Sequence, residues 1–332
     1  MSTIMGEERC ALVLSGGGGR GAFECGAIER LTELAGKHAL PWPPEILVGT
    51  SIGAMNAAVW AIGGTAKVGD MWNQIRTRDM NRFWRLRPWN SILDRSAWKR
   101  TLETYADELE LAQVSQKLYI VATDLNSGRP VVFTNDEHYW DMRAPGRYAH
   151  LTCQKVDAID HTHLLASSAI PYAYPKVEAA VQVEVKKPDG STAIEPRAHK
   201  LWDGVLMYNA PLQPAIDAGA TRIWVVLLSP FHERKDLPTP GRGLLARIGY
   251  VIDLATMSTF ENDLEQTFRR VHEELRDCKC QVIAPQEWLG VGAYFSYSKK
   301  QIEDLRDRGA DAASRAWERL QKDGWDWDSA RL

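Results

Sequence analysis

The sequence predicts an α/β protein whose central sheet is mostly parallel. Two apolar strands near the start of the chain, Ala11–Ser15 and Ile46–Val48, each run through a glycine-bearing turn into a helical pattern. This alternation of strand and helix is typical of βαβ units with right-handed crossovers. A third apolar run, Arg222–Leu228, has the continuous hydrophobicity of a strand that is buried on both faces of a parallel sheet.

The other elements follow from hydrophobic periodicity and from turn residues. In chain order we expect helices over 23–35 and 54–62, a helical region over about 70–115, a strand over 118–123 with a hairpin partner over 130–133, an inserted hairpin over 181–200, a surface loop over 229–243, helices over 245–276 and 298–322, and a short strand over 281–284. No shift in composition marks a domain boundary. We therefore expect one domain, with a core over 8–228 and a helical extension over 229–332 packed on it.

The composition is that of an ordinary globular protein. The 332 residues include 45% hydrophobic and 25% charged ones, and the net charge of −3 does not indicate a nucleic-acid partner. Five scattered cysteines do not suggest a disulfide framework, which favours a reducing compartment and hence a cytoplasmic location. The polar N-terminal residues do not resemble a signal peptide, and no apolar run reaches the roughly 18 residues of a membrane span. Any membrane contact is therefore expected to be peripheral.

A candidate nucleophile follows the second strand. The residues Gly49-Thr50-Ser51-Ile52-Gly53 match the G-x-S-x-G pattern between a predicted strand and a predicted helix, which is the setting of a nucleophile elbow. Gly49 and Gly53 fit the elbow because larger side chains would clash with the backbone of so sharp a turn. The helix that follows directs its free N–H groups and positive dipole end toward developing negative charge. The alternative is a strand–helix turn that is merely rich in glycine and serine.

A glycine-rich loop follows the first strand and allows several interpretations. A dinucleotide site is disfavoured because the next strand ends in Gly49-Thr50-Ser51 rather than in an acidic residue, and a phosphate-binding P-loop is excluded because Ala22 follows Gly21. The third interpretation is an oxyanion hole, in which consecutive N–H groups converge on one point and an arginine adds charge nearby. A turn required only for tight packing remains the alternative. The residues concerned are Gly16, Gly17, Gly18, Gly19, Arg20 and Gly21.

A serine nucleophile needs an adjacent base, and the sequence offers two arrangements. In the first, Asp203, within Trp202-Asp203-Gly204, acts directly on Ser51 as a dyad. In the second, Ser51 and Asp203 form a triad with His232 or His272, in the chain order of the α/β-hydrolases. Neither histidine lies in a recognisable strand-end motif, which favours surface positions for both.

Five segments together resemble the patatin-like phospholipase family, in the order that the family shows. They are LSGGGGRGAFECGAIERL (14–31), VGTSIGAMNAA (48–58), VATDLNSGRPVVF (121–133), ASSAIPYAYPKV (166–177) and DGVLMYNAPLQPAIDAGATRIWVV (203–226). The resemblance extends over about residues 10–228. One departure is Val205, where the family usually has Gly or Ala, and we expect it to alter the pocket wall slightly.

The resemblance implies a three-layer sandwich around the mostly parallel sheet. It also implies lipid acyl hydrolysis by a Ser51–Asp203 dyad without a catalytic histidine, and an oxyanion hole formed by the glycine loop with Arg20 close by. No cofactor or metal is expected, and neither His161-x-His163 nor Cys278-x-Cys280 has a partner pair at zinc spacing. The expected partner is a lipid or phospholipid substrate. A histidine-dependent esterase, a catalytically silent lipid-binding protein and acyl transfer to an acceptor other than water remain the alternatives.

The segment over 70–100 is basic and rich in tryptophan. It holds eight Arg and Lys against three Asp, a net charge of +5, together with Trp72, Trp84, Trp89 and Trp98. Such a segment could form a lid or a membrane-docking surface. The alternative is a cap that packs its aromatic side chains inward and its arginines outward. The head group, the acyl length and the oligomeric state are not determined by the sequence.

Overall fold

The central sheet of the computed structural model joins nine strands among the described residues, which are 8–38, 40–83, 91–137, 152–230, 239, 242–254, 278–290 and 293–325. The main order of the sheet is β11-β10-β1-β2-β5-β6-β7, and β9 joins it by pairing with β5 and β8. The strands are β1 (Cys10–Leu14), β2 (Ile46–Thr50), β5 (Lys117–Asp124), β6 (Arg129–Thr134), β7 (Thr152–Lys155), β8 (Val177–Lys186), β9 (Thr192–Asp203), β10 (Arg222–Val226) and β11 (Lys279–Ile283).

The middle of the sheet is parallel, as predicted. The pairs β11–β10, β10–β1, β1–β2 and β2–β5 are all parallel, whereas β5 and β6 form the expected antiparallel hairpin. Every residue of β1 is buried. A central strand of a parallel sheet is covered on both faces, which explains its uninterrupted apolar sequence.

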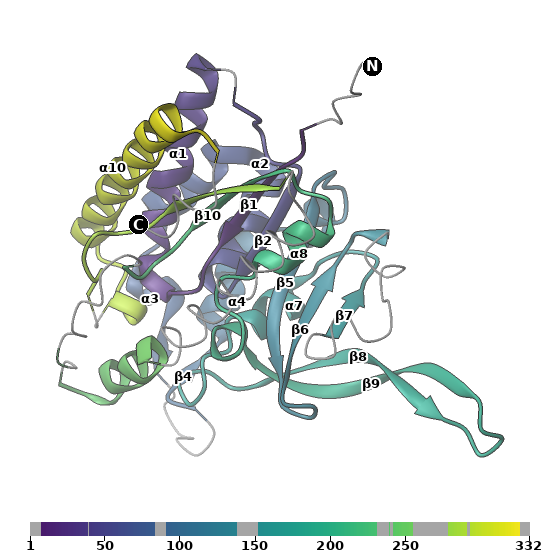
Figure 1. Ribbon diagram of the computed structural model, residues 1–332. Coiled ribbons are helices and arrows are strands. Elements are labelled where there is room, and N and C mark those ends of the chain that lie inside the picture. The colour runs from purple at the N-terminus through teal and green to yellow at the C-terminus, as the bar shows by residue number, and fades with distance from the viewer. Residues whose placement is uncertain are drawn as a thin grey trace, which may run out of the picture.

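Helices cover the two faces unequally, which confirms the three-layer arrangement. Leu12 and Leu14 belong to the cluster that packs with the long helices on one face, whereas Ala11 and Val13 pack with α8 (Leu212–Asp217) on the other. Figure 1 shows α8 on the opposite side of the sheet from the long helices. The helices on the first face are α1 (Ala22–Lys37), α2 (Ile52–Gln74), α4 (Ser96–Tyr105), α7 (His161–Ser167) and α10 (Lys299–Asp323).

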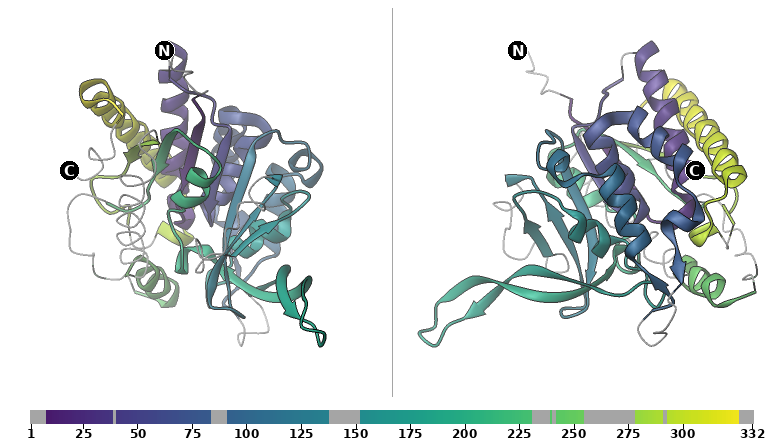
Figure 2. Two further views of the ribbon diagram at one scale, coloured as in Figure 1. Left: turned by 45° about the vertical axis from the view of Figure 1, so that its right-hand side comes forward. Right: turned by 180° about the vertical axis from the view of Figure 1, so that it is seen from behind.

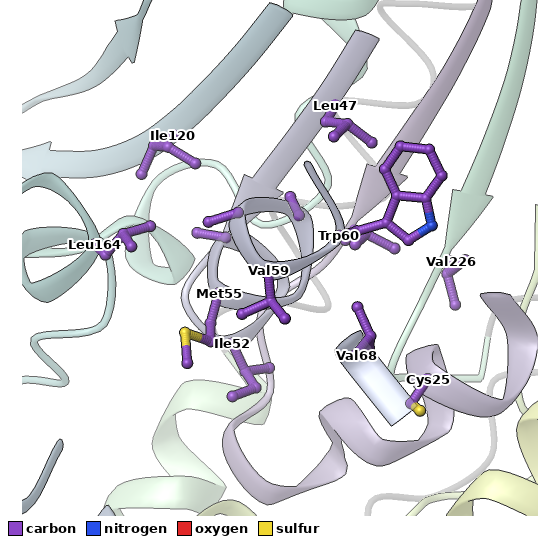
Figure 3. Packing of buried hydrophobic residues seen from close by; sticks show 14 of the residues in the cluster. Cys25, Leu47, Ile52, Met55, Val59, Trp60, Val68, Ile120, Leu164 and Val226 are labelled. Atoms are coloured by element: carbon purple, nitrogen blue, oxygen red, sulfur yellow. The ribbon is translucent and has the colours of Figure 1, made fainter. Parts of the chain in front are cut away.

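The larger core lies between this helical layer and the sheet. Figure 3 shows Ile52, Met55 and Val59 of α2 pointing into the same cluster as Leu47 of β2 and Ile120 of β5. All five side chains are at most 3% exposed. Full burial of an aliphatic side chain contributes about 1.5–3 kcal/mol, so this cluster fixes the start of α2 against the sheet.

The C-terminal helix α10 lies side by side with α1, as Figures 1 and 2 show. Glycines make this approach possible. A Cβ atom on Gly26 would lie 1.9 Å from the carbonyl oxygen of Arg306, and one on Gly309 would lie 2.0 Å from that of Phe23. The extension after residue 228 also adds β11 to the sheet edge beside β10.

Several predicted elements differ from the observed ones. The helix expected over 54–62 continues to Gln74, with a non-helical break at Gly63 and Gly64. The helical region expected over 70–115 is wrong in part. It contains the short helices α3 (Thr77–Met80), α4 and α5 (Glu108–Leu111), but also an antiparallel strand pair, β3 (Arg82–Phe83) and β4 (Leu93–Asp94).

Tertiary contacts explain this strand pair, because buried Leu93 donates its N–H to the carbonyl of Ala173, far along the chain. Of the helix expected over 245–276, the structure describes residues 244–254, which are helical, and the remainder lies outside the described residues. Most of the surface loop expected over 229–243 also lies outside them.

The inserted hairpin is longer than predicted and projects from the body of the protein as a two-stranded arm (Figure 1). Its turn closes through a hydrogen bond from the N–H of Lys187 to the carbonyl of Ser191, 2.8 Å long. At the other end of the arm, Leu201 and Trp202 of β9 pair with Asp124 and Thr123 of β5. The hairpin is therefore anchored in the central sheet. Among the described helices, none combines the length and apolar character that a membrane-spanning segment requires.

Candidate active site

Ser51 lies at the sharp turn between β2 and α2. Its backbone has φ 55° and ψ −121°, a left-handed conformation that is strained for a residue with a side chain. The flanking glycines are required by close contacts. A Cβ atom on Gly49 would lie 2.6 Å from the backbone of Ala54, and one on Gly53 would lie 2.5 Å from the carbonyl oxygen of Leu14. The turn therefore has the geometry expected of a nucleophile elbow.

Asp203 reaches the elbow because β2 and β9 both pair with β5, and β9 begins its pairing where that of β2 ends. Thr50, the last residue of β2, pairs with Val121 of β5, and Asp203 pairs with Ala122, the next residue of β5. The hydroxyl of Thr123 donates to the carbonyl of Asp203, 2.8 Å away, and fixes its backbone. The end of β9 is thereby held next to the residue that follows Thr50.

The side chains of Ser51 and Asp203 are in direct contact. The Oγ of Ser51 donates to Oδ2 of Asp203 at 2.7 Å, and the N–H of Val205 donates to Oδ1 at 2.9 Å. Asp203 is fully buried. Burial raises the pKa of this carboxyl to about 7, although the hydrogen bonds from Val205 and Ser51 oppose the rise. The pair can therefore exchange a proton near neutral pH.

The glycine loop lies against the elbow. A Cβ atom on Gly16 would lie 3.0 Å from Cβ of Ser51, and the N–H of Gly16 donates to Oδ1 of Asn209 at 2.7 Å. Gly16 thus has its N–H engaged, which argues against the expectation that it serves as an oxyanion donor. Its contribution is the close approach to Ser51.

The next residues of the loop hold the better candidate donors. No described residue accepts a hydrogen bond from the N–H of Gly17 or Gly18. Gly18 has φ +60° and begins the 3₁₀ turn η1 (Gly18–Gly21). It lines the same cavity as Ser51 and Ile52, the first residue of α2. Free amides beside a serine hydroxyl are the arrangement that stabilises an oxyanion.

The remaining loop residues are occupied by structural contacts. Arg20 is 1% exposed, and its Nη2 lies 2.9 Å from Oδ1 of Asp253, which is fully buried. Gly19 is buried within η1. The carbonyl of Gly21 accepts a hydrogen bond from Nδ2 of Asn56 at 3.1 Å. Participation of Gly19, Arg20 and Gly21 in an oxyanion hole stays a prediction.

The cavity beside Ser51 is small and mostly apolar. Its volume is about 20 Å³, enough for a water molecule but not for an acyl chain. The lining residues are Gly18, Ser51, Ile52, Met80, Trp98, Ser168, Ile170, Tyr174, Tyr294, Phe295 and Tyr297. Val205 is not among them, but it packs in one cluster with three residues that are, Ile170, Tyr174 and Tyr294. Through these contacts Val205 can affect the pocket wall, and the slight alteration expected there stays a prediction.

The histidines proposed for a triad, His232 and His272, lie outside the described residues. Trp72 and Trp98 are buried, as expected for a cap that packs its aromatic side chains inward, whereas Trp84 and Trp89 lie outside the described residues.

The side chains of His161-x-His163 and Cys278-x-Cys280 are buried within the fold. His161 bonds the carbonyl of Ala106 and His163 pairs with Asp160, while Cys278 and Cys280 are buried. In the described ranges, no group of three His, Cys, Asp or Glu side chains could hold a metal ion.

The structure adds residues that the sequence did not single out for a role. Ser167, at the end of α7, accepts the N–H of Ser51 through its Oγ at 2.9 Å. Asn209 holds Gly16, while Asp253 and Tyr294 contact Arg20. No local motif reveals these residues, because each of the partners just named lies at least 116 residues away in the chain.

A comparison with protein families finds a match over residues 12–216 to the model described as patatin-like phospholipase. The chain belongs to the patatin-like phospholipase family. Membership carries the activity class of the family, lipid acyl hydrolysis, and a lipid substrate. No match was found among the curated proteins. Among solved structures, this patatin-like phospholipase is similar to VipD from Legionella pneumophila, with 11% identity, a TM-score of 0.42, and coverage of 94% of this chain and 67% of that one.

Proposed function

We propose that this protein hydrolyses carboxylic esters of lipids, with Ser51 as the nucleophile and Asp203 as the general base. The observation that carries the proposal is the 2.7 Å hydrogen bond from Oγ of Ser51 to Oδ2 of the buried Asp203. Membership of the family supports the lipid class of the substrate. The mostly apolar wall of the cavity beside Ser51 is consistent with an acyl chain.

The reaction proceeds through an acyl-enzyme. Oγ of Ser51 attacks the ester carbonyl while its proton passes to Oδ2 of Asp203, and the carbonyl oxygen becomes an oxyanion. As the tetrahedral intermediate collapses, the alcohol leaves and takes the proton from Asp203. Water then gives a proton to the same carboxylate and attacks the acyl group. Release of the fatty acid returns the proton to Ser51.

The amides of Gly17, Gly18 and Ile52 are the proposed oxyanion donors. Gly18 and Ile52 line the cavity with Ser51, and Ile52 begins α2, whose positive dipole end adds to the field at that point. Removing one such donor typically costs about 2.7–4 kcal/mol of transition-state stabilisation. The loop can therefore supply a large part of the catalysis.

A dyad is favoured over a triad by the partners of Asp203. In a Ser-His-Asp triad the carboxylate holds the imidazole, which separates it from the serine. Here one oxygen of Asp203 binds the serine hydroxyl directly and the other accepts the N–H of Val205. The carboxylate is also buried, so an imidazole would have to displace Ser51 to reach it.

Ester hydrolysis and active-site labelling test the proposal. Wild type, Ser51→Ala, Asp203→Asn, His232→Ala and His272→Ala are assayed on a phospholipid and ester panel and labelled with a fluorophosphonate probe. We expect labelling of Ser51, no activity in Ser51→Ala, and a loss of about 10²–10⁴-fold in Asp203→Asn. Loss of activity in a histidine variant would indicate the triad. A wild type that neither labels nor hydrolyses any ester would indicate a catalytically silent lipid-binding protein.

Hydrolysis is distinguished from acyl transfer by product analysis, since both share the acyl-enzyme.

The cytoplasmic location, the peripheral membrane contact, and the division into a core over 8–228 and an extension over 229–332 stay predictions of the sequence.

A further inference from the structure

Arg20 lies in a fully buried cluster with Asp253 and Tyr294. Its Nη2 is 2.9 Å from Oδ1 of Asp253, and its guanidinium carbon lies 3.9 Å from the centre of the Tyr294 ring. The hydroxyl of Tyr294 donates to the same oxygen of Asp253 at 2.9 Å. The three side chains are at most 2% exposed. Such a charge pair is held in one geometry because any other arrangement leaves a buried charge without a partner.

The partners of Arg20 come from a part of the chain that the family model does not match. The match ends at residue 216, whereas Asp253 lies in the helix over 244–254 and Tyr294 in η3 (Ala293–Phe295). The helix is the unlabelled green one at the lower left of Figure 1. A second contact joins these regions, since a Cβ atom on Gly18 would lie 2.3 Å from the carbonyl oxygen of Tyr294.

Arg20 in turn holds the carbonyl of Gly17. Both its backbone N–H and its Nε donate to that oxygen, each at 3.3 Å. The carbonyl of Gly17 and the N–H of Gly18 belong to one planar trans peptide and therefore point in opposite directions. Fixing the carbonyl toward Arg20 turns the N–H of Gly18 away from Arg20. That N–H has no acceptor among the described residues, and Gly18 lines the cavity with Ser51.

We propose that Asp253 and Tyr294 are positioning residues that act through Arg20 to aim the Gly18 amide at the oxyanion formed at Ser51. The inference rests on the proposed function. It assigns the helix over 244–254 and η3 a part in catalysis through Asp253 and Tyr294, whose contacts are with Arg20. Asp253 orients the guanidinium, Tyr294 orients the carboxylate of Asp253, and the guanidinium holds the Gly17–Gly18 peptide.

A second, partly buried cluster provides a control of similar chemistry. The hydroxyl of Tyr119 donates to Oδ2 of Asp136 at 2.6 Å, and Nζ of Lys117 lies 2.9 Å from the same oxygen. This cluster has the same three kinds of group, a phenol, a carboxylate and a cation. It lies at the start of β5, whereas Asp203 is paired near the end of that strand. Substitutions in this cluster should lower the stability of the protein but leave the glycine loop over 16–21 unchanged.

The test measures kcat and KM for a soluble short-chain p-nitrophenyl ester in Asp253→Asn, Tyr294→Phe, Asp136→Asn and Tyr119→Phe. Fluorophosphonate titration gives the concentration of active sites, so unfolded protein does not enter kcat. A displaced oxyanion donor costs kcat rather than KM. We expect kcat to fall about 100-fold in Asp253→Asn and about 10-fold in Tyr294→Phe, and to change less than about 3-fold in the two controls.

A trifluoromethyl ketone provides a readout that a purely structural role would not move. Oγ of Ser51 adds to the ketone carbonyl and forms a tetrahedral adduct, whose oxyanion resembles that of the transition state. The inhibition constant of the ketone should rise in Asp253→Asn by the same factor by which kcat/KM falls. If Asp253→Asn does not fold, the results for Tyr294→Phe test the inference, because that variant keeps the Arg20–Asp253 ion pair and the aromatic ring beside Arg20.

Two results would overturn the inference alone. One is an active wild type that depends on Ser51, with Asp253→Asn and Tyr294→Phe no slower per active site than the controls. The other is a fall in kcat without a change in the inhibition constant of the ketone. A wild type without esterase activity, or an active Ser51→Ala, would overturn the proposed function, and the inference with it.

Discussion

Asp203 is paired with Ala122 of β5, directly after the point at which β2 ends its own pairing with that strand. The contact between Ser51 and Asp203 is therefore set by the register of three strands. Sites built on strands hold their side chains more tightly than sites on loops. The hydroxyl and the carboxylate, 152 residues apart in sequence, are thus in contact before any substrate binds.

The activity should rise with pH through neutrality. Asp203 acts as a base only when it is ionised, and burial raises its pKa to about 7. The kcat/KM for a neutral ester should increase about tenfold per pH unit below that value and level off above it. A profile measured from about pH 5 to about pH 9 checks this. A rate that stays flat through neutrality would contradict a base with this pKa, and the residual activity of Asp203→Asn should lack the step.

Asp203→Asn should stabilise the protein while it removes activity. The folded pKa of about 7 lies above the ordinary value of about 3.9, so the folded state binds more protons between these values and its stability falls as the pH rises through them. Asn does not ionise, and the variant should gain up to about 4 kcal/mol in unfolding free energy above neutral pH. Urea unfolding at about pH 5 and about pH 8 measures the difference. An equal gain at both pH values would show that the charge of Asp203 is not its source.

Gly16→Ala should abolish most of the activity, because the added methyl would lie 3.0 Å from Cβ of Ser51 and 2.9 Å from Oδ1 of Asn209. A shift of about 1 Å in a reacting group can cost about 100-fold in rate. The matched control is Gly36→Ala in α1, where a methyl meets nothing within 4 Å. That variant should keep full activity and gain roughly 0.5–1 kcal/mol in stability. Equal activity in the two variants would refute the close approach of the loop to Ser51.

Phe295→Ala should shift the substrate preference toward longer acyl chains. Phe295 lines the cavity of about 20 Å³ beside Ser51, which must widen to admit a chain. Each further methylene that is buried contributes about 0.8 kcal/mol, or roughly fourfold in kcat/KM. A series of p-nitrophenyl esters from butyrate to laurate measures the preference. Trp317→Ala, a partly buried aromatic on α10, is the control and should leave the preference unchanged. The same shift in both variants would place the acyl chain elsewhere.

Local patterns were sufficient to predict the elements around the site. The elbow at Ser51 needs glycines at 49 and 53 because the backbone itself fills the space beside them, and that requirement is written in five consecutive residues. The apolar strands and the helix periodicity likewise depend on neighbours in the chain. Local patterns did not predict the strand pair within 70–115, since Leu93 of β4 is held by a hydrogen bond to the carbonyl of Ala173, far along the chain.

The sequence by itself determined which residue types stand at the turns, and with them the elbow, the glycine loop and the candidate base. It left open whether Asp203 serves Ser51 directly, because that contact depends on β9 pairing with β5 where β2 ends. Only the tertiary structure decided that Arg20 pairs with Asp253 and that the Gly16 amide is held by Asn209. Buried polar groups need hydrogen-bond partners, but these partners lie on segments that are distant in sequence and meet only in the folded protein.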